Sequence, residues 1–386
     1  MVNSIPNEYL IIDKRTAKQF SKITFSKYML KDVTAALSKS LMSCKLEEAM
    51  NWSVELLISG YIEKFWDKIL TIGIKNVNIN NPNLGYFLYT RYSKYIDLSK
   101  KYDSLAIRNS QCSRNLVAEV CFTVCNSLKT KSISFAKIKE NDFNMSYLES
   151  KVLANDPDIV KDKLKYGDPC EAKMILNEFN YCLINKKYEL CVYWLSWIFD
   201  WEKRNTKKDK MYICGVREIQ NVDKKYYTNL SWLVWEIILK EGVKTNNEFL
   251  NKQIQSLYKL YKFNFKSSNK GKKAPIFLYA IKYFTDNYHY GKDINNYNIL
   301  VQVTLNINNL FFDKANCAIN NNSVREEHAF NKSKQEIVTE LNIKKQKEKT
   351  STEKKKLVEL KKAADLKMKL KIRAVEEIDK IILSKK

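Results

Sequence analysis

The sequence predicts an all-α fold: two helical domains built from helical hairpins, followed by a long basic C-terminal helix. Glycine and proline are scarce, with 8 and 5 in 386 residues, whereas all-β sandwiches and phosphate-loop enzymes need many glycine turns. Apolar residues recur at the spacing of one helical turn along much of the chain. Hydrophobic residues make up 45% of the sequence, enough for a sizeable core.

The clearest helical pattern lies in residues 46–72 and predicts a helical hairpin. Gly60 separates two apolar stripes and fits a helix C-terminal cap. The stripes comprise Leu46, Met50, Val54 and Leu57, then Ile62, Phe65, Trp66, Ile69 and Ile72. The nearby acids are expected on the polar faces, where they solvate a helix or pair with lysine: Glu47, Glu48, Glu55 and Glu63.

This hairpin belongs to a first domain predicted over residues 1–154. The hairpin ends before Pro82, because proline disfavours helical geometry in its predecessor. A third helix begins at Leu84, and a fourth spans residues 115–128. Residues 129–165 are irregular, so the domain boundary is placed near residue 155.

A second domain is predicted over residues 155–324. Asp168, Pro169 and Glu171 suit the cap, the first position and the third position of a helix that runs to Ile184. Further helices are expected over 188–204, 224–241, 246–262, 275–287 and 294–312. Two tryptophan stripes at helical spacing are typical of core, namely Trp194, Trp197 and Trp201, and Trp232 and Trp235.

The last segment, 325–386, predicts a long amphipathic basic helix. Apolar residues from Leu357 to Ile382 step by three or four, and Lys344 to Arg373 holds thirteen Lys or Arg against four Asp or Glu. Counterion release makes such a helix a candidate contact for nucleic-acid phosphates. The candidate contacts are Lys344, Lys345, Lys347, Lys354, Lys355, Lys356, Lys361, Lys362, Lys367, Lys369, Lys371 and Arg373.

Other interpretations of this tail are self-association through a coiled coil, a membrane-surface helix and a solvated disordered segment. The apolar stripe argues against pure disorder, and the lack of aromatic residues weakens the membrane interpretation. The net charge of the whole chain, +24, favours polyanionic partners, although a genomic bias toward lysine codons would also raise it. The nine cysteines show no disulfide-framework spacing, and neither a secretory signal nor a bilayer-spanning stretch is found. We therefore expect a soluble protein in a reducing compartment.

Several enzyme patterns are incomplete. Cys121 and Cys125, with Cys112 nearby, lack the second ligand pair of a zinc site, and we interpret all three as buried thiols. His289 and His328 are the only histidines and have no nucleophile beside them. No metal, cofactor or small-molecule substrate is predicted.

The segment from Ser267 to Pro275 fails the phosphate-loop pattern, because Gly271 has no partner glycine and no hydroxyl follows the lysines. As an exposed basic loop it remains a candidate phosphate contact through Lys270, Lys272 and Lys273, with Lys266 beside them. An ordinary solvated loop is the alternative.

Residues 47–82 resemble the helical region that follows the ATPase core in replication-restart AAA+ ATPases related to clamp loaders. The resemblance is carried by Ala49, Trp52, Leu56, Ser59, Gly60, Ile62 and the stretch from Asn76 to Pro82. The family's acids are replaced here by Lys75 and Asn76, its glycine by Asn78, and no ATPase motif precedes the region. The resemblance implies a subunit-assembly surface, and we assign Trp52 and Trp66 as candidate partner-binding residues.

The whole chain also resembles uncharacterised helical proteins of large nucleocytoplasmic DNA viruses. The carriers are residues 46–69, 81–92 and the tryptophan-rich pair 193–198 and 230–237. This resemblance implies a virus-encoded protein in the host cytoplasm, at the viral replication site, or in the virion interior.

These observations favour a non-enzymatic nucleic-acid-binding or scaffolding factor in viral DNA replication, transcription or packaging. The expected partners are nucleic acid, with DNA favoured, and other proteins or further copies of the chain, but no membrane. The alternatives are an internal virion structural protein, and an enzyme whose site is assembled from distant residues.

Overall fold

Helices account for the regular structure of the computed structural model, which describes residues 10–207, 214–288 and 297–328. In these ranges the only β interaction is an isolated bridge between Ile23 and Met29, so the all-α prediction is confirmed. The described chain up to Asn316 forms one compact unit, to which residues 317–328 do not belong. None of the helices described combines the length and apolarity needed to cross a bilayer.

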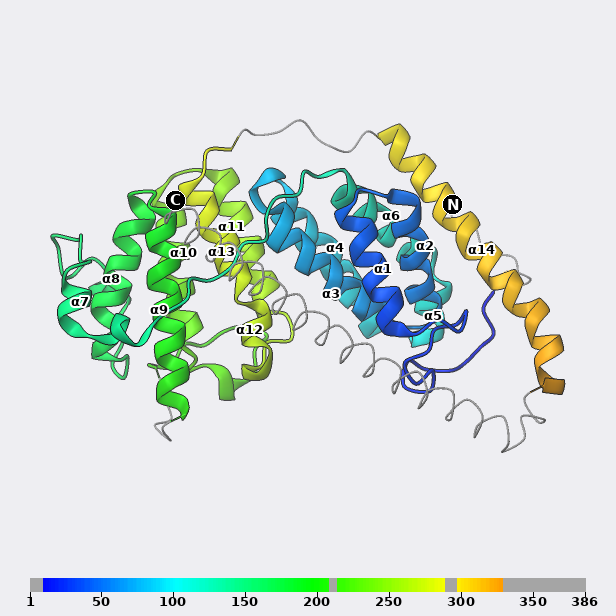
Figure 1. Ribbon diagram of the computed structural model, residues 1–386, viewed down its shortest axis with the longest axis horizontal. Coiled ribbons are helices and arrows are strands. Elements are labelled where there is room, and N and C mark those ends of the chain that lie inside the picture. The colour runs from blue at the N-terminus through cyan, green and yellow to red at the C-terminus, as the bar shows by residue number, and fades with distance from the viewer. Residues whose placement is uncertain (1–9, 208–213, 289–296, 329–386) are drawn as a thin grey trace, which may run out of the picture. The chain divides into compact units, whose positions relative to one another are not determined.

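Six helices form the first part of the compact unit: α1 (Leu30–Met42), α2 (Leu46–Ile58), α3 (Ile62–Ile72), α4 (Leu84–Lys101), α5 (Ser104–Asn109) and α6 (Gln111–Asn126). Figure 1 shows them in blue to cyan. The predicted hairpin is α2 and α3, and Gly60 between them has a φ of +72°, a conformation that favours glycine. Helix α3 continues through a π-helical turn (Gly73–Val77) and a 3-10 turn (Asn78–Asn80) before Pro82.

The later helices follow a largely irregular segment, residues 127–169, that contains the short α7 (Met145–Glu149). They are α8 (Cys170–Ile184), α9 (Tyr188–Lys207), α10 (Leu230–Lys244), α11 (Glu248–Lys262), α12 (Lys270–Lys273) and α13 (Pro275–Thr285). The expected helix over 224–241 starts late, because Asn229 caps α10 by accepting a hydrogen bond from the Ser231 amide. The helix expected over 115–128 starts early, at Gln111, where Ser110 caps it.

The predicted tryptophan core is confirmed for four of the five side chains, since Trp194, Trp197, Trp232 and Trp235 are all buried. Trp201 is half-buried and stacks on Trp197.

Helices α4 and α11 cross closely at Gly85. A Cβ atom at Gly85 would lie 3.0 Å from Gln253 Oε1, and the adjacent amide of Tyr86 donates to that oxygen at 2.8 Å. From α13, the Tyr283 hydroxyl donates to the Pro82 carbonyl at 2.6 Å. These contacts place the start of α4 against α11 and α13. The boundary predicted near residue 155 lies inside the compact unit, and the two-domain division stays a prediction.

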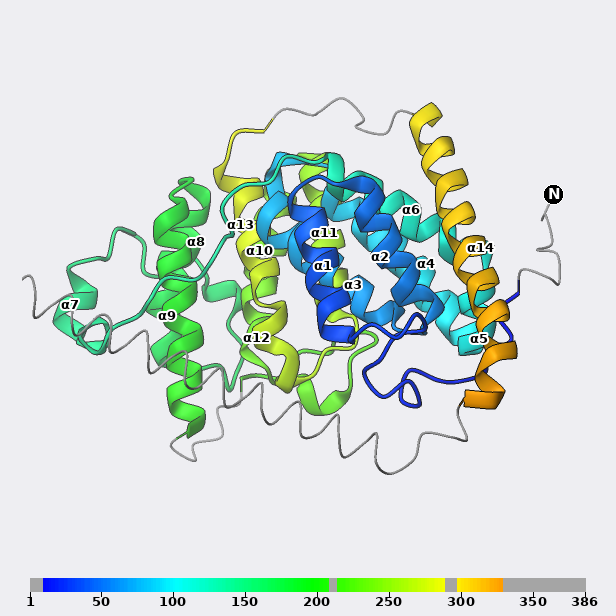
Figure 2. The same ribbon diagram turned by 45° about the vertical axis from the view of Figure 1, so that its right-hand side comes forward.

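Helix α14 (Tyr297–His328) is longer than the helix expected over 294–312. Four side chains at one-turn spacing are buried along it: Val303, Ile307, Phe311 and Ala315. Figures 1 and 2 both show the first part of α14, up to Asn316, beside α2 and α6. The Arg114 guanidinium of α6 lies 4.5 Å from the Phe311 ring centroid and donates to Asn308 Oδ1 at 2.7 Å.

Glu55 corrects the expectation of a purely polar outer face on α2, because its side chain is fully buried. The Lys314 ammonium of α14 lies 2.8 Å from Glu55 Oε2. The Ser26 amide and hydroxyl each donate to the carboxylate at 2.8 Å. Glu55 therefore joins the N-terminal segment, α2 and α14.

Replacing Lys314 by methionine would leave the buried Glu55 carboxylate without its cation. We expect the free energy of unfolding to fall by about 3 kcal/mol at pH 7. Burial alone would raise the pKa of Glu55, but Lys314 and the hydrogen bonds from Ser26 outweigh burial and lower it. A lowered carboxyl pKa stabilises the fold above the unfolded pKa, and this contribution is lost as the pH falls through the folded pKa. Urea denaturation should therefore show a smaller difference between wild type and variant below about pH 4.

The matched control is Lys31→Met on α1, whose exposed side chain has no ion pair among the described residues. We expect that variant to change stability by less than about 0.5 kcal/mol. Equal stability of wild type and Lys314→Met at pH 7 would contradict the assigned role of the ion pair.

Candidate functional site

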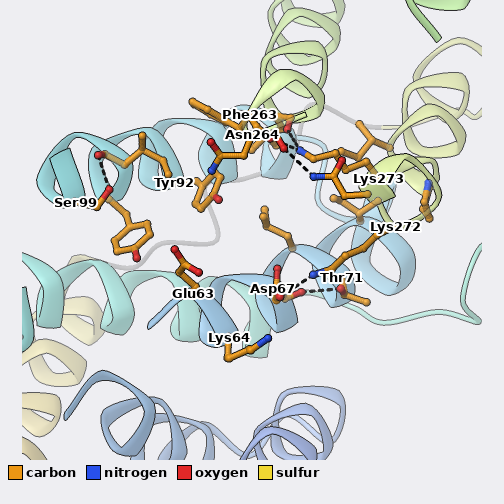
Figure 3. Close-up of a pocket in the computed structure, with 18 of the residues that line it drawn as sticks. Glu63, Lys64, Asp67, Thr71, Tyr92, Ser99, Phe263, Asn264, Lys272 and Lys273 are labelled. Carbon is orange, nitrogen blue, oxygen red and sulfur yellow. Dashed lines mark hydrogen bonds and ion pairs between the residues drawn. The ribbon is translucent and has the colours of Figure 1, made fainter. Parts of the chain in front are cut away.

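A pocket of about 420 Å³ opens between α3, α4 and the segment that runs from α11 to α13. Figure 3 shows that α3 contributes Glu63 and Asp67, α4 contributes Tyr92, and the end of α11 contributes Phe263. The lining also includes the apolar residues Leu70, Ile74, Leu260 and Ile276. The site thus combines carboxylates, phenols, lysines and apolar side chains.

The local helix geometry explains how α3 and α4 build two walls. Glu63 and Asp67 are four residues apart and so share one face of α3. Tyr92 and Tyr95 are three residues apart on α4, and Trp66 of α3 packs against both, with ring centroids 5.2 and 5.8 Å away. The buried Trp66 therefore fixes the spacing between the acidic wall and the tyrosine wall.

The lysines on the third wall have partners in the fold. Lys272 forms an exposed ion pair with Asp67 at 2.7 Å. Lys273 donates to the carbonyls of Leu260, Tyr261 and Phe263 at 3.1, 3.0 and 2.6 Å. These carbonyls lie at the C-terminal end of α11, where a cation is favourable. Burial, and then the charge of Lys272, lower the pKa of Lys273 to about 8.

The prediction of an exposed basic loop is therefore wrong for two of its lysines. Lys270 forms a largely buried ion pair with Glu202 of α9, and Lys273 caps α11. The cost of burying the Lys270 ammonium is offset by Glu202, which lies far away in the sequence. The cost of burying the Lys273 ammonium is offset by the carbonyls at the end of another helix, α11. Lys272 alone of the three is exposed.

Three polar groups in the pocket have no hydrogen-bond partner among the described residues. The Glu63 carboxylate is exposed, and neither it nor the hydroxyls of Tyr92 and Tyr95 has a hydrogen bond within the described residues. Tyr95 is only 5% exposed. Burial, followed by Asp67 and Glu63, raises the pKa of Tyr92 to about 12. Burial, followed by Glu63 and Tyr92, also raises the pKa of Tyr95. Both phenols stay protonated at neutral pH and can donate a hydrogen bond.

Next to the pocket, α4 and α11 present a surface that we call the lysine–tyrosine face: Tyr86, Tyr89, Lys252, Lys259 and Lys262. The Lys252 ammonium lies 3.8 Å from the Tyr86 ring centroid, and the Lys259 ammonium 5.1 Å from that of Tyr89. Tyr89 stacks on Phe263 at 6.0 Å, and Phe263 meets the Tyr92 ring edge-on at 5.3 Å. The face is therefore continuous with the pocket through Phe263.

The cations of this face are not neutralised. Lys252, Lys259 and Lys262 have no carboxylate within ion-pair distance in the described part of the chain. Burial lowers the pKa of Lys262, and the neighbouring charge of Lys259 lowers it further. Sequence reasoning missed this face, although the three lysines occur at i, i+7 and i+10 on one side of α11.

The other sequence-predicted site residues lie elsewhere. The tail residues from Lys344 to Arg373 are outside the described residues, and their phosphate contacts stay predictions. Trp66 is 2% exposed, whereas Trp52 is half-buried and meets Tyr28 edge-on at 5.6 Å. Trp66 thus belongs to the core and Trp52 to the rim of the hairpin, and their partner role stays a prediction.

The cysteines were predicted as buried thiols, which is confirmed for Cys121 and Cys125 and wrong for the exposed Cys112. Burial raises the pKa of Cys125 to about 11, so this thiol stays protonated. Across the described ranges, no group of three or more His, Cys, Asp or Glu side chains could hold a metal ion.

Comparison with protein-family models, with curated proteins and with solved structures finds no match for this chain.

Lys273→Met should remove three hydrogen bonds from the end of α11 and leave those carbonyls partly buried. We expect a loss of about 2 kcal/mol in the free energy of unfolding, measured by urea denaturation. Lys272→Met is the control next to it, and its exposed ion pair should contribute less than about 1 kcal/mol. Equal losses in the two variants would show that the α11 cap is not the stabilising interaction.

Proposed function

We propose that this chain is a non-enzymatic nucleic-acid-binding or scaffolding factor. The observation that carries the proposal is the lysine–tyrosine face, an exposed cationic surface with aromatic rings beside its lysines. Phosphate-backbone binding needs cations that are free to replace counterions, and stacking on bases needs accessible rings. Tyr86 is 38% exposed, and Lys252 and Lys259 are exposed beside it.

The charge of the compact unit supports the same function. Residues 1–316 contain 48 Lys and Arg against 32 Asp and Glu, a net charge of +16. Many of these acids are used within the fold, as in the bidentate pair of Asp168 with the buried Arg217. Acids that are paired internally leave the lysine excess at the surface. This excess produces a positive potential that attracts polyanions over a Debye length.

The basic tail would add further phosphate contacts to those of the compact unit. On the viral resemblance, the proposed setting is DNA replication, transcription or packaging, in the host cytoplasm or the virion interior. The proposed protein partners, or further copies of the chain, would contact the rim of the α2–α3 hairpin around Trp52.

The proposal predicts salt-sensitive binding of labelled duplex and single-stranded oligonucleotides by the full-length chain. The double variant Lys252→Gln, Lys259→Gln should weaken binding and reduce the slope of log affinity against log salt by about 1.5, which corresponds to two lost phosphate contacts. Truncation to residues 1–339 should weaken binding further. The control is Lys31→Gln, Lys137→Gln, which removes two exposed lysines far from the face in sequence.

Absence of binding by the full-length chain at low salt would contradict nucleic-acid binding. Binding that is weak and unchanged by truncation would favour the assembly protein instead, if sedimentation also shows that truncation changes the number of chains in the oligomer.

A further inference from the structure

The geometry points to the pocket as the site for one unstacked base of a single strand whose backbone follows the lysine–tyrosine face. The base would be one with adjacent N–H donors, and guanine fits best. This inference rests on the proposed nucleic-acid binding and adds a base-recognition site to it.

The polar groups of the pocket that lack a hydrogen-bond partner suit a ligand that donates hydrogen bonds to a carboxylate. Glu63 has two acceptor oxygens and no partner within the described ranges. Tyr95 also lines the pocket, and its hydroxyl has no hydrogen-bond partner in the described residues, although only 5% of the residue is exposed. The Tyr95 hydroxyl keeps solvent access, so a bound base would replace water as its hydrogen-bond partner.

Guanine offers N1–H and the N2 amino group side by side on its Watson–Crick edge, so one carboxylate can accept from both. Thymine and uracil place carbonyl oxygens on both sides of their single N–H, and these oxygens would face the negative charge of Glu63. The phenols of Tyr92 and Tyr95 remain protonated and can donate to a base acceptor.

The aromatic and apolar groups suit the flat body of a base. Phe263 meets the Tyr92 ring edge-on at 5.3 Å, and the lining also includes the apolar residues Leu70, Ile74, Leu260 and Ile276. Base stacking on aromatic side chains is typical of single-strand recognition. The volume of about 420 Å³ lies within the usual range for small-ligand sites, about 300–1,000 Å³.

In the proposed complex, the lysines contact the phosphates of the strand rather than the base. Phe263 links the pocket to Tyr89 on the lysine–tyrosine face, where Lys259 and Lys262 lie. Lys64, Lys100 and Lys272 line the pocket itself. This division explains why a pocket rich in lysine also holds an unpaired carboxylate: the cations suit the backbone, and the carboxylate suits the base edge.

The test compares full-length wild type with Glu63→Gln and Tyr95→Phe. The probes are labelled single-stranded dT oligonucleotides with or without one central dG. The readout is the ratio of the two affinities, because a change in net charge alters both alike. Wild type should prefer the dG probe by about tenfold. Glu63→Gln should reduce this preference to less than about twofold, and Tyr95→Phe should reduce it by about threefold.

The control Glu149→Gln makes the same change of charge at an exposed residue of α7 and should keep the wild-type ratio. Wild type that binds both probes equally, or a Glu63→Gln variant that keeps the full preference, would overturn the base site and leave the proposed function standing. Wild type that binds neither probe nor a duplex would overturn the proposed function itself.

Discussion

The close crossing of α4 and α11 is the contact on which the rest of the compact unit depends. Gly85 allows the two helices to approach, and Gln253 occupies the space that a larger side chain would take. Gln253 also accepts from the Tyr86 amide and lies 3.4 Å from the Tyr283 hydroxyl of α13. One buried amide oxygen thus organises three helices. A larger residue at position 85 would separate α4 from α11 and disrupt the pocket and the lysine–tyrosine face together.

Buried charged residues and exposed lysines differ in how their charges are balanced. Buried charges such as Glu55 and Arg217 are matched by partners at hydrogen-bond distance, because an unpaired charge in the interior is very unfavourable. Lys252 and Lys259 of α11 have no carboxylate partner in the described residues, because they are exposed and water solvates them. The same residue type is therefore structural at Lys273, which is half-buried and donates to three carbonyls, and available for binding at Lys259, which is exposed.

Most helices could be predicted from the sequence, because apolar spacing and capping residues are local signals. The hairpin break at Gly60 is an example. The expected cap at Asp168 is wrong, because α8 begins at Cys170 after Pro169 and the Asp168 carboxylate pairs with Arg217 instead. The pocket could not be predicted in this way. It combines residues 63–100 with residues 260–276, and no local pattern fixes which helices pack together. The roles of Lys270 and Lys273 were missed for the same reason, since Glu202 and the α11 carbonyls become neighbours only through tertiary packing. The lysine spacing on α11 was visible in the sequence, but its tyrosine partners on α4 were not.

The ion pair between Glu55 and Lys314 joins residues that are 259 positions apart. A ribosome adds roughly 5–20 residues per second, so Glu55 is synthesised about 13–50 seconds before its cation exists. During this interval Glu55 has no cation beside it, and the side chains that pack against α14 in the folded chain, such as Arg114, are uncovered. The native packing around Glu55 is therefore completed only late in synthesis or after release. The order of translation thus makes α14 the last helix of the compact unit to dock.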